Sequence, residues 1–279
     1  MTEPKIRKRN PFLAAILYLV NAGLGFLYVG KPLLAVIFAL ISIFLIALAA
    51  WAGLFFSPTS FYAAFAVIFS VYMLGMVWVI VYAVKSKPEP LKKYQRWYFY
   101  VGFFIVAAVL YQPLMGYRDR VFGYDMFRFP SGSMLDTLFI GDFVVANTWA
   151  YRNENPKRGD VIVFRFPGDR TIKYLKRIIA IGGDTIEMKD GVTLVNNIAI
   201  KEPYLNEKYT ERTKTNHFPP AVVPKDYYFV LGDNRDHSND SRYWGFVPAS
   251  DVLGKIEFVW FSYGKTEGIR WERLGHIVN

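Results

Sequence analysis

Cysteine is absent from this 279-residue chain, and histidine occurs only three times. The absence of cysteine excludes disulfides and thiol nucleophiles, and it suits an oxidising compartment. Histidine chemistry is restricted to His217, His237 and His276. No group of His, Asp and Glu has the spacing of metal ligands and no glycine-rich phosphate loop is present, so we expect no metal and no cofactor.

Charge is also scarce in the first part of the chain, where Lys31 is the only charged side chain between Asn10 and Val84. Apolar runs cover residues 11–29, 33–56, 61–84 and 97–115. Each run is close to the roughly 20 residues that a helix needs to cross about 30 Å of hydrocarbon, so we predict membrane segments. A removable targeting segment is not expected, because the first run leads directly into further apolar sequence.

The net charge of +10 is concentrated in this apolar half. Residues 1–120 hold 12 Lys and Arg against 3 Asp and Glu, whereas residues 121–279 hold 21 against 20. We therefore expect no nucleic-acid partner, and we expect contact with membrane lipid instead. The basic clusters at residues 5–9 and 85–96 are both placed on the cytoplasmic side of a membrane by the positive-inside rule.

Two cytoplasmic clusters require an even number of crossings between them, yet three apolar runs lie there. The run at 11–29 is interrupted by Asn21, Gly23 and Gly25, so we predict that it lies in the interface or re-enters the membrane. The runs at 33–56, 61–84 and 97–115 then cross. The predicted domains are a membrane-embedded region at 1–116 and an extracytoplasmic β-rich region at 117–279.

Beyond residue 116 the pattern changes to short β-branched and aromatic runs bounded by turn residues. Predicted strands cover 143–146, 161–166, 171–181, 185–188 and 227–231. Alternation along 171–181 places Lys176 on one face with Ile172, Tyr174, Ile178 and Ala180, and Lys173 and Arg177 on the other. This spacing of strands indicates a mainly β domain.

A small-residue turn at 130–142 presents Ser133 just after the last apolar run. A serine nucleophile at neutral pH needs a base, which is usually histidine, and His237 with Asp233 or Asp236 is one possibility. Lysine is the other, where burial lowers its pKa by penalising the ammonium form. Lys176 stands alone in an apolar row and fits that role, although a lysine at a strand edge can also extend to solvent. Spacing does not decide whether Ser133 and Lys176 meet.

Four segments in order resemble the boxes of bacterial type I signal peptidases. They are residues 130–142, 158–164, 174–184 and 232–248. The resemblance implies N-terminal α-helical membrane segments followed by a mainly β catalytic domain, with coiled, partly open barrel-like sheets. It also implies a membrane-bound serine endopeptidase that removes signal peptides from exported preproteins at the outer face of the bacterial cytoplasmic membrane.

The same resemblance implies roles for individual residues. Ser133 would be the nucleophile and Lys176 the general base, while Ser131 would help to stabilise the oxyanion. Ser238 would hold the Lys176 amine, and Asp240 with Arg242 would form an ion pair behind the site. The residues expected to border two shallow substrate pockets are Phe127, Phe129, Met134, Leu138, Tyr174 and Leu175.

Asp136 stands where this family usually has proline. The change removes a fixed φ angle and adds a charge near the nucleophile. A catalytically impaired, membrane-anchored β-domain protein that binds or scaffolds is therefore the alternative function.

Overall fold

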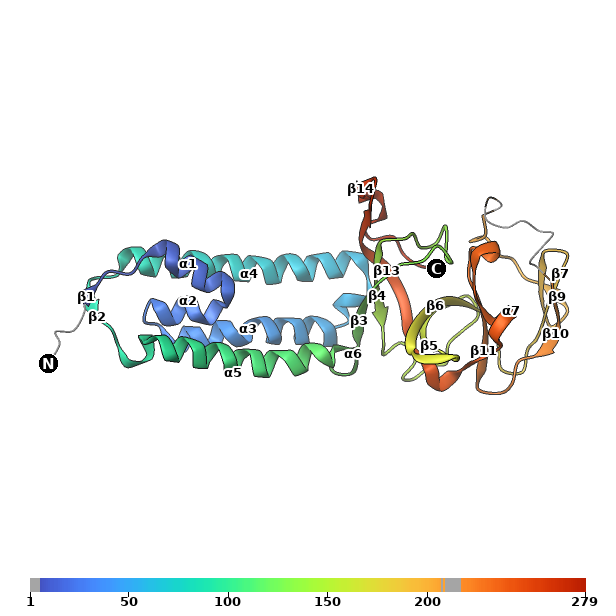
Figure 1. Ribbon diagram of the computed structural model, residues 1–279, viewed down its shortest axis with the longest axis horizontal. Coiled ribbons are helices and arrows are strands. Elements are labelled where there is room, and N and C mark those ends of the chain that lie inside the picture. Colours follow the sequence, from blue (N-terminus) through green and yellow to red (C-terminus); the bar gives the residue numbers. More distant parts are fainter. Residues whose placement is uncertain (1–5, 207, 209–216) are drawn as a thin grey trace. The chain divides into compact units, whose positions relative to one another are not determined.

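The computed structural model describes residues 6–206, 208 and 217–279. Its contacts divide the chain into two compact units. The first comprises Met1–Phe55 with Ser60–Phe122, and the second comprises Phe56–Thr59 with Gly123–Asn279. The first unit is helical and the second is mainly β (Figure 1).

Among the described residues of the first unit, three helices are long and apolar enough to cross a membrane. They are α3 (Pro32–Trp51), α4 (Pro58–Lys85) and α5 (Trp97–Gly116). Strand β1 (Ile6–Arg7) pairs with β2 (Glu89–Pro90), the 3-10 turn η2 (Lys93–Gln95) precedes α5, and α6 (Arg118–Val121) follows α5. Another 3-10 turn, η1 (Leu54–Phe56), precedes α4.

The first apolar run forms two short helices instead of one long one. Helix α1 (Pro11–Val20) ends at Asn21, whose side chain accepts a hydrogen bond from the Gly23 amide and starts α2 (Ala22–Tyr28). At 1.5 Å per residue these helices are about 15 Å and 10 Å long, too short to cross about 30 Å of hydrocarbon. An interfacial or re-entrant position for this run stays a prediction.

Two tyrosines satisfy each other's hydroxyl groups inside the apolar core of the first unit. The Tyr18 hydroxyl donates to the Tyr72 carbonyl at 2.7 Å, and the Tyr72 hydroxyl donates to the Tyr18 carbonyl at 3.0 Å. Tyr18 is fully buried and its ring packs against Phe26 and Phe38. This pairing avoids the cost of an unsatisfied polar group in apolar surroundings.

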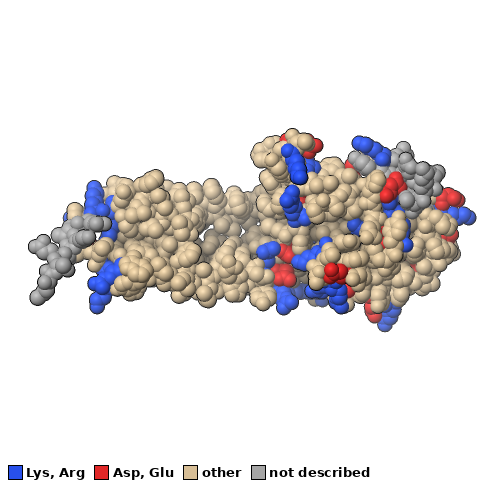
Figure 2. Space-filling view, in the orientation of Figure 1, with Lys and Arg blue, Asp and Glu red and all other residues tan. Residues whose placement is uncertain are grey.

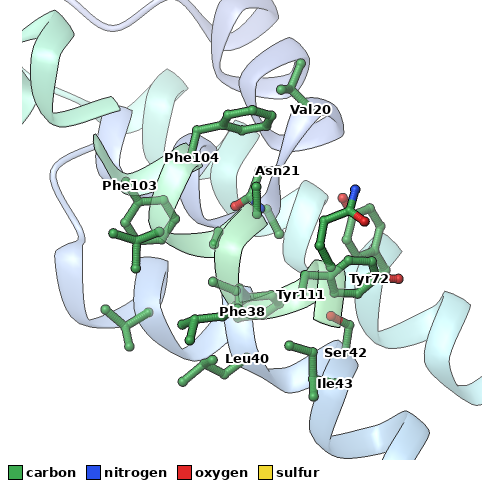
Figure 3. Close-up of a pocket in the computed structure, with 18 residues that line it drawn as sticks. Val20, Asn21, Phe38, Leu40, Ser42, Ile43, Tyr72, Phe103, Phe104 and Tyr111 are labelled. Atoms are coloured by element: carbon green, nitrogen blue, oxygen red, sulfur yellow. The ribbon is translucent and has the colours of Figure 1, made fainter. Parts of the chain in front are cut away.

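A cavity of about 670 Å³ lies among the helices of the first unit. Figure 3 shows Val20 and Asn21 from the α1–α2 break, Phe38 from α3 and Phe103 from α5 around it. The lining is mainly apolar, with a few polar side chains such as Asn21 and Tyr72. Residues of the α1–α2 break therefore form part of the cavity wall.

The second unit is built from antiparallel strands. The larger sheet has the order β12-β11-β6-β5-β13-β4-β3, with β14 paired to β13, and the smaller has the order β10-β7-β8-β9. The path of the larger sheet does not close into a barrel within the described residues. The predicted fold class, apolar helices followed by a mainly β domain with open sheets, is confirmed. The strands are β3 (Tyr124–Arg128), β4 (Asp142–Asn147), β5 (Val161–Phe166), β6 (Asp169–Ile181), β7 (Thr185–Lys189), β8 (Val192–Val195), β9 (Ile198–Ala199), β10 (Phe218–Val222), β11 (Tyr227–Leu231), β12 (Val247–Pro248), β13 (Val252–Gly264) and β14 (Gly268–Ile269).

Strand β6 is central to this unit, because it pairs with β5 on one side and β11 on the other. Its second half is buried on both faces: Leu175 and Ile179 pack in different apolar clusters, and Ile178 packs in a third. The loop before β4 reaches β6 where Ser133 contacts Lys176, and the loop after β11 reaches it where Asp233 pairs with Arg177. The helix α7 (Ser241–Trp244) follows the second of these loops.

Gly141 and Gly159 offer a matched test of how tightly the loop before β4 is packed. Both have φ of +92°, but an added Cβ at Gly141 would lie 2.1 Å from the Tyr263 carbonyl oxygen, whereas one at Gly159 meets nothing within 4 Å. We expect Gly159→Ala to cost about 1–2 kcal/mol from backbone strain and Gly141→Ala about 3–5 kcal/mol, because β13 must also shift. Thermal unfolding of the detergent-solubilised protein measures the difference. Equal losses would contradict the close approach.

Candidate functional site

The loop that carries Ser133 joins β3 to β4 and is closed at its base by backbone hydrogen bonds. The Phe129 amide donates to the Asp142 carbonyl at 2.7 Å, and the Gly141 amide donates to the Phe129 carbonyl at 2.9 Å. Within the loop the Leu138 amide donates to the Met134 carbonyl at 2.7 Å. Met134 and Leu138 are fully buried, so the loop is anchored from below and Ser133 has a defined position.

Ser133 and Lys176, which sequence reasoning proposed separately, lie in direct contact. The Lys176 Nζ donates to the Ser133 Oγ at 2.7 Å across a separation of 43 residues. Ser133 is 7% exposed and Lys176 is 4% exposed. A hydroxyl and an amine at this distance can exchange a proton.

Burial lowers the pKa of Lys176 from 10.5 to about 8. Desolvation is the main cause, and the positive charge of Arg242 acts in the same direction. Asp240 and Asp233 oppose it, because a nearby carboxylate favours the ammonium form. A substantial fraction of the amine is therefore neutral near pH 8 and free to accept a proton.

Ser131 lies beside Ser133, as the resemblance implies. Its Oγ is 3.1 Å from the Ser133 Oγ, and it accepts a hydrogen bond from the Ser133 amide at 3.4 Å. Ser131 is exposed whereas Ser133 is buried. Its hydroxyl thus lies at the solvent side of Ser133, where a reacting group would enter.

Asn234 holds the Ser133 loop from the opposite side and was not singled out by sequence reasoning. Its backbone N–H donates to the Ser133 carbonyl at 3.1 Å, and its side-chain Nδ2 donates to the Gly132 carbonyl at 2.8 Å. Asn234 is 2% exposed. The only signal for it in the sequence is its place between Asp233 and Arg235 in the segment 232–248.

The ion pair between Asp240 and Arg242 is present behind the site. Arg242 Nε donates to Asp240 Oδ1 at 2.8 Å, and the other carboxylate oxygen accepts from the Gly232 amide at 3.1 Å. Arg242 also donates to the Arg235 carbonyl at 2.6 Å. The pair connects both ends of the loop from Gly232 to Arg242 and so fixes its shape.

Ser238 is close to the site but is arranged differently from the expectation. Its Oγ is buried and has no hydrogen-bond partner among the described residues, so it does not hold the Lys176 amine here. An added Cβ at Gly232 would lie 2.2 Å from the Ser238 Oγ and 2.4 Å from the Ser133 carbonyl oxygen. Gly232 therefore allows Ser238 and the Ser133 loop to approach each other.

A second buried ion pair joins Arg177 to Asp233, next to Lys176 in the chain. Arg177 donates to Asp233 through Nε at 2.9 Å and through a terminal nitrogen at 2.7 Å. The Thr137 hydroxyl donates to the same carboxylate at 2.5 Å. Alternation placed Arg177 on the face opposite Lys176, and it is only 1% exposed, because β6 is covered on both faces.

The six residues expected to border the substrate pockets fall into two groups. Phe129, Met134, Leu138 and Leu175 are buried in one apolar cluster. Phe127 packs against that cluster and Tyr174 packs against another, and both are half-buried. Four of the six thus form the support below the site, and only Phe127 and Tyr174 keep part of their surface exposed.

The residues of the histidine-dependent alternative do not form a site with Ser133. His237 is exposed and has no hydrogen bond to Ser133 in the described part of the chain, while Asp233 is occupied by Arg177 and Thr137.

The Asp136 carboxylate accepts a hydrogen bond from the Asn206 side chain. The Asp136–Asn206 contact lies on the rim of a cavity of about 620 Å³ that also includes Thr137 and Tyr204. No group of three or more His, Asp or Glu that could hold a metal is found among residues 6–206, 208 and 217–279.

Comparison with known proteins gives consistent matches. Residues 97–261 match the family described as "Signal peptidase, peptidase S26". Signal peptidase I of Aquifex aeolicus is 31% identical over 232 residues, covering 63% of this chain and 88% of that protein. Signal peptidase I of Pseudomonas fluorescens is 30% identical over 242 residues, covering 70% and 79%. A crystal structure of a signal peptidase I from Enterococcus faecalis is 34% identical, covers 37% of this chain and 97% of that one, and has a TM-score of 0.33.

Replacing Lys176 should change the pH dependence of stability in a defined direction. Its pKa is about 8 when folded and 10.5 ordinarily, so between these values the unfolded chain binds more protons and stability rises with pH. Below pH 8 the Lys176 side chain is mainly a buried ammonium in the folded protein, so the full desolvation cost lowers the free energy of unfolding there. We expect Lys176→Met to raise the free energy of unfolding at pH 7 by up to about 3 kcal/mol, with the gain vanishing towards pH 10.5.

Thermal unfolding of both proteins from pH 6 to pH 10 measures this effect. The control is Lys255→Met, which removes a half-exposed lysine paired with Asp160 and should show no such gain. A gain for Lys176→Met that stays constant with pH would contradict the lowered pKa.

Proposed function

We propose that this chain, which belongs to the signal peptidase family, peptidase S26, removes N-terminal signal peptides from exported preproteins. The reaction would pass through an acyl-enzyme, with Ser133 as the nucleophile and Lys176 as the general base. Members of this family are serine endopeptidases. The observation that carries the proposal is the 2.7 Å contact between the Ser133 Oγ and the Lys176 Nζ. The hydrogen bonds from Asn234 to the Ser133 loop and the burial of Lys176 support that contact.

The first half of the reaction forms an ester on Ser133. Neutral Lys176 accepts the proton of the Ser133 hydroxyl as the Oγ attacks the scissile carbonyl carbon. The carbonyl oxygen becomes an oxyanion in the tetrahedral intermediate. Lys176 then returns its proton to the leaving amine as the peptide bond breaks, which releases the mature protein and leaves the signal peptide bound to Ser133 as an ester.

The second half removes the signal peptide. Lys176, neutral again, accepts a proton from a water molecule that attacks the ester carbonyl. The second tetrahedral intermediate collapses, the proton passes from Lys176 to the Ser133 Oγ, and the signal peptide leaves with a free carboxylate. The enzyme returns to its starting state, so no cofactor is needed.

The Ser131 hydroxyl and the Ser133 amide are the donors that we assign to the oxyanion. The amide donates to the Ser131 Oγ in the free protein at 3.4 Å, which is a long and weak bond that a substrate oxygen could replace. Donors positioned in advance stabilise the charge that develops in the transition state, and one such donor is typically worth about 3 kcal/mol.

Substrate selection is assigned to the apolar surface beside Ser133. An extended preprotein segment would add backbone hydrogen bonds along a strand edge, and shallow pockets would exclude large side chains near the cut. Phe127 and Tyr174 are half-buried and would contact the substrate, while Phe129, Met134, Leu138 and Leu175 would support the pocket floor.

The apolar helices and the family together indicate a membrane-anchored protein. We propose that α3, α4 and α5 cross the bacterial cytoplasmic membrane and that the β unit works on its outer face. The basic clusters at 5–9 and 85–96 would then remain cytoplasmic. A signal peptide holds its apolar stretch in the bilayer, so its cleavage site would be presented near the membrane surface.

Three variants test the proposed chemistry. We expect Ser133→Ala and Lys176→Ala each to lose cleavage of a preprotein by at least about a thousandfold, because the nucleophile or its base is removed. His237→Ala, the matched control, should retain wild-type activity, since His237 is exposed. The assay uses detergent-purified protein, and N-terminal sequencing of the product should place the cut after a small-x-small motif.

The outcomes separate the competing functions. Loss in His237→Ala but not in Lys176→Ala would favour a histidine-dependent hydrolase. No cleavage by folded wild-type protein would favour the binding or scaffold protein, with Asp136 as the first residue to replace by proline.

The pH dependence of cleavage should follow the Lys176 amine. Because its pKa is about 8, kcat/KM should rise with pH and reach half of its plateau near pH 8. Steady-state rates from pH 6 to pH 10 measure this profile, with unfolding checked at each pH. A profile that is flat between pH 7 and pH 9 would exclude Lys176 as the base.

A further inference from the structure

The helical unit carries a basic pocket of about 380 Å³ that has no part in the proposed chemistry. Its charged lining residues are Arg9, Lys31, Lys85, Lys87, Lys92 and Glu89. Five cations thus face one carboxylate. Figure 2 shows Lys and Arg gathered at the end of this unit that bears β1 and β2, while the surface along its helices is uncharged.

Arg9 is the best indicator that the pocket receives an anion. Its side chain is only 9% exposed, yet its hydrogen-bond acceptor is the neutral Gln95 Oε1 at 2.7 Å. The guanidinium also lies 5.5 Å from the centre of the Tyr28 ring. No carboxylate pairs with Arg9 within the described part of the chain, although buried cations are normally paired. Arg9 therefore leaves donors and charge available to a ligand.

A hydrogen-bonded frame holds the pocket in shape. Gln95, which is 5% exposed, donates to the Tyr28 carbonyl at 3.1 Å and accepts from the Lys92 amide at 3.1 Å. The Arg9 amide donates to the Ser86 hydroxyl at 3.1 Å. The frame thus connects the segment before α1, the end of α2, the end of α4 and the turn before α5, and it positions the cations without neutralising them.

The pocket lies where three candidate membrane-spanning helices end. Lys31 directly precedes α3, Lys85 is the last residue of α4, and Lys92 lies five residues before α5 begins. Leu33 and Val84 do not line the pocket, but they lie within two residues of Lys31 and Lys85 in the chain and are 73% and 53% exposed. A ligand there meets cations at the level of lipid headgroups and exposed apolar side chains next to them, which matches a phospholipid with its phosphate and acyl chains.

We propose that this pocket binds the phosphate headgroup of one anionic phospholipid, with Arg9 and the surrounding lysines as its donors. The assignment does not depend on the peptidase function of the β unit. Lysine and arginine are both donors that suit phosphate oxygens. A free phosphate shares that chemistry, but it would leave Leu33 and Val84 unused, so the lipid is the ligand that we assign.

Native mass spectrometry of the full-length detergent-purified protein can count bound phosphatidylglycerol, with phosphatidylcholine as the uncharged comparison. The pocket variant is Lys31→Gln/Lys85→Gln/Lys87→Gln. The matched control is Lys8→Gln/Lys93→Gln/Arg96→Gln, which removes the same charge from exposed residues of the same end that do not line the pocket. Thermal unfolding of each detergent-purified variant verifies folding without relying on peptidase activity, and the single variant Lys87→Glu, at an exposed site, serves if the triple variant does not fold.

We expect one tightly bound phosphatidylglycerol, weakened about tenfold or more in the pocket variant and less than about threefold in the control. Equal weakening in both triple variants would mean a diffuse surface charge and would overturn the proposal. Equal binding of phosphatidylcholine would also overturn it. Displacement of the lipid by excess inorganic phosphate would identify a site for free phosphate instead.

Discussion

The contact between a buried lysine amine and a serine hydroxyl is the constraint on which the rest of the β unit depends. Lys176 is 4% exposed, and burial opposes its charge and lowers its pKa to about 8. Such an environment requires a strand that is covered on both faces. Strand β6 meets this requirement because apolar clusters pack against both of its faces, with Leu175 and Ile179 in two of them and Ile178 in a third. The loop from β3 to β4 then brings the Ser133 hydroxyl to within 2.7 Å of this buried amine.

Buried ion pairs surround this contact and fix the loops that form it. Arg177 pairs with Asp233 at 2.7 Å, Arg242 pairs with Asp240 at 2.8 Å, and Arg235 pairs with Glu202. Pairs of this kind add little net stability, since desolvation offsets their attraction, but they disfavour any arrangement that leaves a charge unpaired. This fixed loop holds Ser133 in two ways. The Asn234 backbone amide donates a hydrogen bond to the Ser133 carbonyl, and Gly232 packs closely against the same carbonyl. Geometry at the site is therefore maintained by polar contacts, while stability comes from the apolar clusters around it.

The helical unit follows a different physical logic. Its helices expose many large apolar side chains, such as Phe12 and Leu33 at 74% and 73%, which suits contact with lipid. Polar groups inside it are paired locally, as in the reciprocal hydrogen bonds of Tyr18 and Tyr72. Its positive charge gathers at the end near β1 and β2, apart from Arg118 and Arg120 of α6. At that end Arg9 is buried without a carboxylate partner in the described residues. The two proposals therefore assign two roles to the same charge: orienting the chain in a membrane and binding a lipid.

Local patterns in the sequence determined the element types of this protein. The expected strands at 161–166 and 227–231 coincide with β5 and β11, and the expected strand at 171–181 lies within β6 (Asp169–Ile181). Period-2 alternation and apolar runs are properties of neighbouring residues, so they are visible without a fold. The four sequence boxes likewise identified Ser133 and Lys176 as candidates. Tertiary structure alone decided their contact across 43 residues and the burial of Arg177 against Asp233. It also decided the contacts of Asn234 with the Ser133 loop and left the Ser238 hydroxyl without a hydrogen-bond partner among the described residues. These features depend on which loops meet over β6, and that pairing is set by long-range packing, which no local pattern encodes.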